Sequence, residues 1–491
     1  MRYGYRSVMA ILAQAASSME RIVVFMVLSR TLSVFDYGVY QQVLLYYLVA
    51  LPIFLFGLNS SMMYFLPKAN PEQQKTVVYQ TFILVGLIDL LLSIFTFIFA
   101  NEIASAFASP SIAVYIKIFA VYPLLSVPQK ILNLMQIMNN EPVRATVTST
   151  LYTVAMILFT CLPSLMKFPL IYTLYSTVIG SGILYTGIFI YILRYYRNQK
   201  FELDTKLFKA QIFYALPLGI ATIFATLTNQ INRLIVSSSF TPEKYAIFAN
   251  GSFEVPFSAM IMGATMTVLI PEFVKLFKNG QNNDGTLKLW NDATYKTSIF
   301  LFPIGAGLFV MAQEFVVILY SEKYLASVPI FRIYILLTFL RITEYSALLQ
   351  AAGKVGHILA ATIVTLVINL LLSLALIQVM DISGPAWANV ITTYLWAVIY
   401  LVMISKLFKI PYHKVMPWKK LGKILLLSVI AGTILYPFLS INLNVFFKFF
   451  IGVIIYAVIY ICLLLIFKVV DIDTLGRYLS QIKTNAFNKA K

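Results

Sequence analysis

Residues 27–40, VLSRTLSVFDYGVY, align without a gap with residues 235–248, IVSSSFTPEKYAIF, at an offset of 208 residues. Each stretch ends one apolar segment and leads into the next. A later match keeps nearly the same offset, because Gly57 corresponds to Gly263. A shared offset at distant positions is typical of an internal duplication. The sequence therefore predicts two homologous halves in one chain.

The composition around these stretches excludes a soluble fold. The chain is 60% hydrophobic and 11% charged, with a mean hydropathy of +0.84, whereas soluble domains have about 25% charged residues. Its two cysteines, Cys161 and Cys462, lie in separate apolar runs and form neither a metal-binding spacing nor a disulfide framework.

Apolar segments of membrane-spanning length follow one another along the whole chain. A helix needs roughly 20 apolar residues to cross about 30 Å of hydrocarbon. We therefore predict an all-α polytopic membrane protein with about fourteen transmembrane helices, near residues 8–29, 38–62, 77–100, 112–137, 143–165, 170–193, 210–235, 245–272, 294–319, 327–349, 356–379, 385–405, 421–440 and 446–467.

The formal net charge of +18 comes from cations in alternate loops. The loop after the sixth span is typical, with Arg194, Arg197, Lys200, Lys206 and Lys209. Such loops could bind lipids or partners, but their alternation is the positive-inside signal and implies no nucleic-acid partner. It predicts that both termini face the cytoplasm.

The duplication and the spans together predict the domain organisation. Residues 1–195 form an N-lobe of helices 1–6, 196–209 a basic cytoplasmic linker, 210–407 a C-lobe of helices 7–12, and 408–491 helices 13–14 with a basic tail. Because each lobe has an even number of spans, the two lobes form a parallel repeat, related by an axis along the membrane normal. Substrate should pass between them.

Polar residues recur at helical spacing on the first helix of each lobe. Positions three and four apart lie on one helix face. The stripe of the first helix is Gln14, Ser17, Ser18 and Arg21, and that of the seventh is Thr222, Thr226, Asn229 and Arg233.

The second helix of each lobe carries a similar polar pair. Gln42 and Tyr46 correspond to Asn250 and Glu254 at the offset of 208 residues. We infer that helices 1, 2, 7 and 8 line a central cavity.

Charged residues inside the spans are the candidate functional groups. A charge at the helix centre costs about 2.5–3.5 kcal/mol on insertion scales, so these residues should not face lipid. They are Glu20, Arg21, Asp89, Lys130, Arg233, Glu254, Arg341 and Glu344.

Several of these groups have alternative interpretations. Arg233 has no carboxylate within four residues, which favours an anion contact, although a carboxylate from another helix could pair with it. Arg341 and Glu344, three residues apart, could neutralise each other or serve substrate. Asp89 could bind a proton or sodium, or be hydrated near a helix end. The ion-coupling candidates are Asp89, Glu254 and Glu20.

The sequence offers little for catalysis. Each predicted outer loop has about a dozen residues or fewer, the only histidines are His357 and His413, and no P-loop, nucleotide fingerprint or metal-ligand cluster occurs. We predict a transporter without cofactors. An integral enzyme of polysaccharide assembly and a structural or channel protein are the distant alternatives.

Four stretches resemble the multidrug, oligosaccharidyl-lipid and polysaccharide exporter superfamily, and in particular its O-antigen (Wzx-like) flippase branch. They are SRTLSVFDYGVYQ (29–41), LPLGIATIFATLTNQINRLIVSSSFTPEKYAIFA (216–249), VVILYSEKYLASVPIFRIYIL (316–336) and INLLLSLALIQVMDISGPAWANVITT (368–393). The chain departs from the pattern at Asn232, because the family often has an acidic residue beside the basic one on helix seven.

The resemblance implies a flippase of the bacterial inner membrane that moves undecaprenyl-pyrophosphate-linked oligosaccharide. Drug or cation antiporters and lipid II flippases share the architecture. Membrane lipids, H⁺ or Na⁺, a polysaccharide polymerase and the chain-length machinery are candidate partners. Our hypothesis places the pyrophosphate beside Arg21 and Arg233, with the remaining substrate-binding candidates being Gln14, Ser18, Asn229, Asn250 and Arg341.

Overall fold

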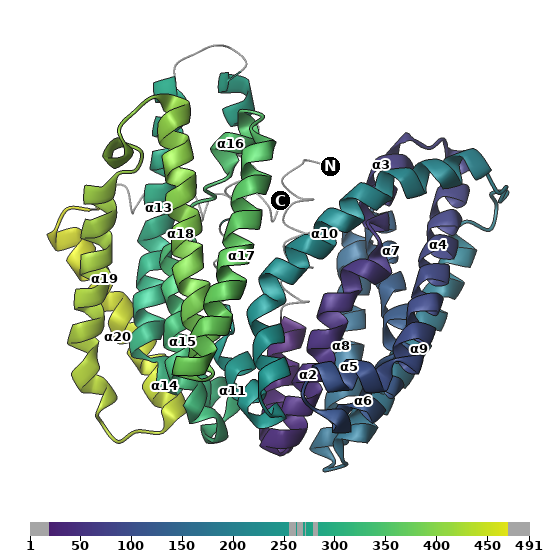
Figure 1. Ribbon diagram of the computed structural model, residues 1–491, viewed down its shortest axis with the longest axis horizontal. Coiled ribbons are helices and arrows are strands. Elements are labelled where there is room, and N and C mark those ends of the chain that lie inside the picture. The colour runs from purple at the N-terminus through teal and green to yellow at the C-terminus, as the bar shows by residue number, and fades with distance from the viewer. Residues whose placement is uncertain (1–18, 255–261, 263–268, 271, 278–282, 470–491) are drawn as a thin grey trace, which may run out of the picture. The chain divides into compact units, whose positions relative to one another are not determined.

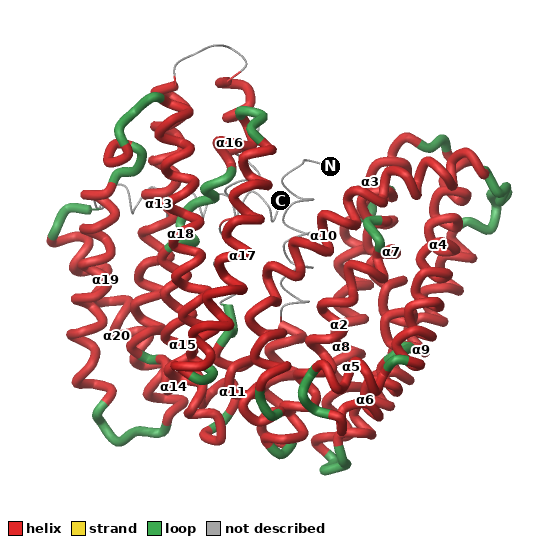
Figure 2. The backbone as a smooth tube through the Cα atoms, in the orientation of Figure 1, coloured by secondary structure: helices red, strands yellow, loops and turns green. Residues whose placement is uncertain are grey.

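The computed structural model describes residues 19–254, 262, 269–270, 272–277 and 283–469. All regular structure within these residues is helical, and they contain no strand (Figure 2). The chain divides into two compact units. Residues up to Asn250 form unit 1, together with Leu319–Lys323 and Ile377–Pro385; unit 2 consists of Gly251–Ile318, Tyr324–Leu376 and the residues from Ala386 onward.

Unit 1 is a bundle of helices (Figure 1). Residues 19–31 are helical, and the elements that follow are α2 (Val34–Leu55), α3 (Leu58–Phe65), η1 (Leu66–Lys68), α4 (Pro71–Ile98), α5 (Ala100–Ala106), η2 (Pro110–Ile112), α6 (Ala113–Phe119), α7 (Tyr122–Met138), α8 (Pro142–Leu165), α9 (Leu170–Tyr195), α10 (Thr205–Ser239) and α11 (Pro242–Gly251).

Unit 2 is a second bundle. Its elements are α13 (Asn283–Val310), α14 (Ala312–Tyr320), η3 (Glu322–Ser327), α15 (Val328–Ile335), η4 (Leu336–Phe339), α16 (Ala347–Ala351), α17 (Val355–Met380), α18 (Ser383–Phe408), η5 (Tyr412–Lys414), α19 (Trp418–Leu439) and α20 (Val445–Ile466). The ends of α14, α17 and α18 lie in the short segments that belong to unit 1.

The helices confirm a polytopic membrane fold. Among the described residues, ten helices are long and apolar enough to span a membrane, or eleven if the bent pair Pro110–Phe119 and Tyr122–Met138 forms one span. The first and eighth predicted spans lie partly outside the described residues. The prediction of one continuous helix over 327–349 is wrong, because the chain breaks between η4 and α16.

The break has a local cause in its polar side chains. The Glu344 carboxylate accepts hydrogen bonds from the backbone N–H and the hydroxyl of Ser346, at 3.4 and 2.8 Å. Local bonds of this kind compete with the hydrogen bonds of a helix. The apolar composition of 327–349 concealed this competition.

Helix α10 packs within unit 1, although the lobe boundary predicted from sequence falls before it. Its Gln211 amide donates to the backbone oxygen of Val77 and to the Thr81 hydroxyl, at 3.3 and 3.1 Å. The Ser61 hydroxyl donates to the Gln211 backbone oxygen at 3.3 Å. These bonds join α10 to α3 and α4. The duplication into six-helix lobes stays a prediction.

Two glycines allow α10 and α11 to approach α2 closely. Gly57 has φ +71°, and a Cβ there would lie 2.3 Å from the Ala215 oxygen and 2.7 Å from the Gly219 nitrogen. At Gly38 a Cβ would lie 2.0 Å from the Pro242 oxygen. At Gly57 only glycine combines the positive φ with such backbone proximity at little cost, and at Gly38 the close backbone contact alone excludes a side chain. These contacts position the part of α10 that carries Arg233.

We expect Gly57→Ala to lower the thermal stability of the purified protein in detergent. A left-handed conformation costs a non-glycine residue about 1–2 kcal/mol, and the clash with α10 adds to that penalty. Gly86→Ala is the matched control, because a Cβ at Gly86 meets nothing within 4 Å. Intrinsic fluorescence melting measures both variants, and equal melting temperatures would contradict this account of the α2–α10 contact.

Candidate functional site

Three cations on three helices of unit 1 lie within electrostatic reach of one another. Arg21 belongs to the helix of residues 19–31, Lys130 to α7 and Arg233 to α10. The charge of Arg233 acts on Arg21, and that of Arg21 acts on Lys130. The Arg21 side chain is exposed, and the other two are half-buried. Unit 1 thus gathers positive charge that is widely separated in sequence.

Arg21 and Arg233 occupy comparable depths along their helices. Arg21 lies ten residues before the end of its helix and Arg233 six residues before the end of α10. At 1.5 Å per residue these positions are about 9–15 Å from helix ends on the predicted side of the membrane opposite to the basic loops. Lys130 lies eight residues before the end of α7, the second part of a bent span.

Glu20 is the carboxylate next to this group. Its charge acts on Arg21, and Thr153 of α8 lies near it. Tyrosines from α2, α7 and α8 also lie within its electrostatic reach, namely Tyr40, Tyr47, Tyr122 and Tyr152. Arg21, Lys130, Arg233 and Glu20 together carry a formal excess of two positive charges. The arrangement suits a polyvalent anion.

The other predicted substrate residues occupy different surroundings. Gln14 and Ser18 lie outside the described residues, and Asn229 is exposed on α10. Asn250 is only 1% exposed. Its Oδ1 accepts a hydrogen bond from the Tyr37 hydroxyl at 2.8 Å, and that hydroxyl accepts one from Gln41 at 2.7 Å. Asn250 therefore stabilises the packing of α11 on α2.

Arg341 lies in unit 2 and pairs with another predicted site residue. Its Nη2 is 3.0 Å from Oε2 of Glu254, with both side chains about half exposed (47% and 51%). The sequence spacing suggested Glu344 as the partner, but that carboxylate accepts a hydrogen bond from the Ser346 hydroxyl. Arg341 therefore pairs with a carboxylate 87 positions away in the sequence and not with its neighbour Glu344.

Asp89 lies in the interior of unit 1. It is fully buried on α4, and neither carboxyl oxygen has a hydrogen-bond partner among the described residues. Its charge acts on Tyr47 of α2, whose hydroxyl lies 3.2 Å from that of Ser126. A buried carboxylate without a partner is costly unless a proton or cation neutralises it. Asp89 thus differs from Glu254, which has a cationic partner.

Lys130 is the member of the cation group that sequence reasoning did not place in the site. Its signal was present, because a lysine in the middle of an apolar span should not face lipid. The sequence could not show that Lys130 lies near Arg21, because Arg21 stands more than one hundred positions earlier in the chain. In the described part of the chain, no group of three or more His, Cys, Asp or Glu side chains could hold a metal ion.

The sequence matches the family model described as "Polysaccharide biosynthesis protein" over residues 27–329, which is more than half of the chain. The chain belongs to this polysaccharide biosynthesis protein family. This match agrees with the polysaccharide branch that the sequence resembles, and this family member is a multi-pass membrane protein. The matched range includes Lys130 and Arg233. No curated protein matches the chain.

Solved structures show the fold of this family member. It resembles "Lipid II flippase MurJ, inward closed conformation", with a TM-score of 0.72 and 19% identity over 93% of this chain and 98% of that one. It also resembles an inward-facing multidrug resistance MATE family transporter (TM-score 0.63, 14% identity, 81% of this chain and 94% of that one). For a MOP superfamily transporter from Pyrococcus furiosus the TM-score is 0.56 and the identity 12%, over 82% of this chain and 94% of that one.

Proposed function

We propose that this protein is a flippase that translocates an undecaprenyl-pyrophosphate-linked oligosaccharide across the bacterial inner membrane. The substrate would be a repeat unit of O-antigen, capsule or another polysaccharide. Membership in the polysaccharide biosynthesis family supports the substrate class. The observation that carries the proposal is the grouping of Arg21, Lys130 and Arg233 in unit 1.

The chemistry of the cation group suits a pyrophosphate. A guanidinium donates two parallel hydrogen bonds to phosphate oxygens, while an ammonium acts as a compact point charge. Such contacts strengthen where water is scarce and the local dielectric is low. The formal excess of two positive charges would balance the negative charge of a pyrophosphate head group.

The transport cycle follows from this assignment. The head group enters from the cytoplasmic side and the pyrophosphate binds the cation group. The sugars occupy hydrated space beside exposed polar side chains such as Asn229, and the polyprenyl tail stays in lipid. Rocking of two lobes then exposes the head group to the outer side, where a polysaccharide polymerase and the chain-length machinery would receive it. The protein acts as a transporter rather than an enzyme, with both termini in the cytoplasm.

Lipid II is the second candidate substrate, because the similarity to its flippase covers 93% of the chain. Its head group also joins sugars to a pyrophosphate, so the same cations would serve. The multidrug resistance MATE family transporter matches 81% of the chain, which is a smaller share. A drug or cation antiporter would have little need for a group of cations inside the membrane. We therefore favour a lipid substrate.

We expect Arg21→Ala, Lys130→Ala and Arg233→Ala each to reduce translocation of undecaprenyl-pyrophosphate-linked oligosaccharide in proteoliposomes. A hydrogen bond to a charged group contributes about 1.5–3 kcal/mol. Each substitution should therefore lower the translocation of this lipid by roughly tenfold or more. The assay compares this lipid with lipid II at matched protein density.

Arg197→Ala is the control for these variants, since Arg197 is exposed in the loop after α9. It should transport as the unmodified protein does. Unchanged transport in all three site variants would show that the pyrophosphate does not bind these cations. Efficient efflux of a toxic cation by the unmodified protein, without flipping of either lipid, would favour the antiporter.

We further propose Asp89 as the coupling site and a proton as the coupling ion. One proton neutralises a buried carboxyl, whereas sodium would need several additional oxygen ligands around it. Both Asp89 oxygens lack partners among the described residues. Of the other candidates, Glu254 is paired with Arg341 and Glu20 lies beside Arg21.

Asp89→Asn tests this assignment, because an amide mimics the neutral acid and cannot exchange a proton. We expect an imposed proton gradient to accelerate flipping by the unmodified protein, and the variant to flip at a rate independent of that gradient. Glu254→Gln should keep the gradient response. A normal response in Asp89→Asn, or acceleration of the unmodified protein by sodium alone, would show that the coupling site or ion is different.

A further inference from the structure

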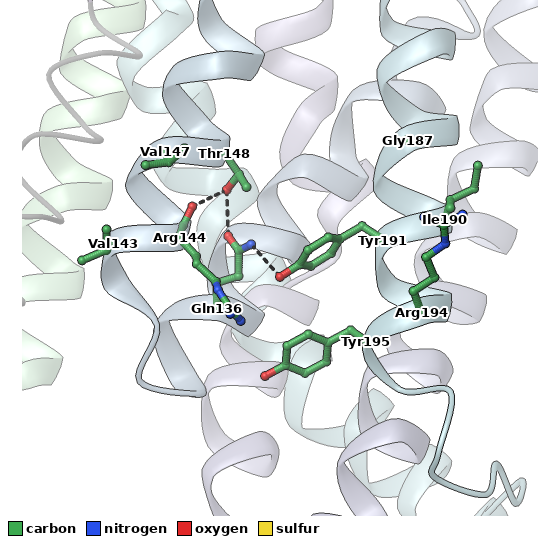
Figure 3. Close-up of a pocket in the computed structure, with 10 residues that line it drawn as sticks. All are labelled: Gln136, Val143, Arg144, Val147, Thr148, Gly187, Ile190, Tyr191, Arg194 and Tyr195. Carbon is green, nitrogen blue, oxygen red and sulfur yellow. Dashed lines mark hydrogen bonds between the residues drawn. The ribbon is translucent and has the colours of Figure 1, made fainter.

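A cavity of about 680 Å³ lies in unit 1, and none of the residues that line it belongs to the cation group. Its walls come from the first turns of α8 and the last turns of α9, and Gln136 of α7 also lines it (Figure 3). Figure 3 shows the side chains of α8 and α9 on either side of Gln136. The cavity is therefore open between two membrane-spanning helices near one end of each.

The walls of this cavity are apolar and unfilled by protein. Val143 and Val147 of α8 are 42% and 51% exposed, and Ile190 of α9 is 43% exposed. A Cβ added at Gly187 would meet no atom within 4 Å. In a bilayer, hydrocarbon fills such a space. The wall residues can accept an acyl chain that runs along α8 and α9.

The end of the cavity near the loops is polar and basic. Arg144 begins α8 and Arg194 ends α9, and both are exposed. Arg144 Nη1 lies 2.8 Å from Oε1 of Glu141, which leaves a formal excess of one positive charge among these three groups. The Thr148 hydroxyl donates to Gln136 at 2.8 Å, and the Gln136 amide donates to the Tyr191 hydroxyl at 3.5 Å.

We propose that this cavity binds an anionic phospholipid of the cytoplasmic leaflet, with its phosphate at Arg144 and Arg194 and an acyl chain along Val147, Gly187 and Ile190. Basic pockets between transmembrane helices on the cytoplasmic side recognise anionic head groups. The two arginines lie on the side of the basic loops, where the positive-inside pattern places the cytoplasm. The apolar wall continues directly from the basic end, as the chemistry of a phospholipid requires.

Native mass spectrometry of the purified full-length protein tests this proposal with phosphatidylglycerol as the probe and phosphatidylethanolamine as the zwitterionic comparison. Two variants change different parts of the site. Arg144→Ala with Arg194→Ala removes the charges, and Gly187→Leu fills the apolar space while leaving the charges intact. Their controls are Arg197→Ala and Gly86→Leu, since Gly86 also has open space around its Cβ.

We expect the unmodified protein and both controls to retain phosphatidylglycerol over phosphatidylethanolamine. The double arginine variant should retain about tenfold less of it, as loss of a charge-assisted contact implies, and Gly187→Leu should also retain less, because its side chain occupies the space of the acyl chain. Equal retention of the two lipids, or undiminished phosphatidylglycerol binding in either site variant, would overturn the proposal. Preferential retention of undecaprenyl pyrophosphate through Arg144 and Arg194 would also overturn it, because the cavity would then hold substrate lipid.

Discussion

An ionised side chain inside a bilayer must meet water, an opposite charge or a bound ligand. The penalty for a charge at the helix centre, about 2.5–3.5 kcal/mol on insertion scales, applies to every cation that a span carries. Unit 1 accommodates Arg21, Lys130 and Arg233 within reach of one another, with Glu20 as the carboxylate beside Arg21. Like charges repel, and under the proposed function the phosphates of a lipid head group would relieve that repulsion.

Backbone packing makes the grouping possible. Arg233 can lie near Arg21 because α10 packs closely on α2 and α3, where Gly57 and Gly219 let the two backbones meet. Gln211 joins α10 to α4 farther along the same helix. The glycines and the buried amide thus determine where a cation on α10 lies relative to cations on the first helix and α7. The position of Arg233 therefore depends on packing contacts between uncharged residues.

The sequence was informative about helices and less so about partners. Span length and apolar composition predicted most of the membrane-spanning helices, because crossing a membrane is a requirement that each segment meets alone. Pairing depends on tertiary contacts. The spacing suggested Glu344 for Arg341, whereas Glu254 is the partner. Asn250 had the spacing of a cavity residue, yet it packs against Tyr37. The charge of Lys130 was evident in the sequence, but only the structure shows that Lys130 lies near Arg21.

The accessibility of position 130 tests the central claim most directly. In a background with Cys161→Ser and Cys462→Ser, Lys130→Cys is treated with a water-soluble, negatively charged thiol reagent in membranes, with and without undecaprenyl pyrophosphate. The account predicts that the reagent reaches position 130 and that the pyrophosphate lipid slows the reaction, while the uncharged polyprenol does not. A position that never reacts, or that reacts equally fast under all three conditions, would contradict a phosphate-binding group of cations in unit 1.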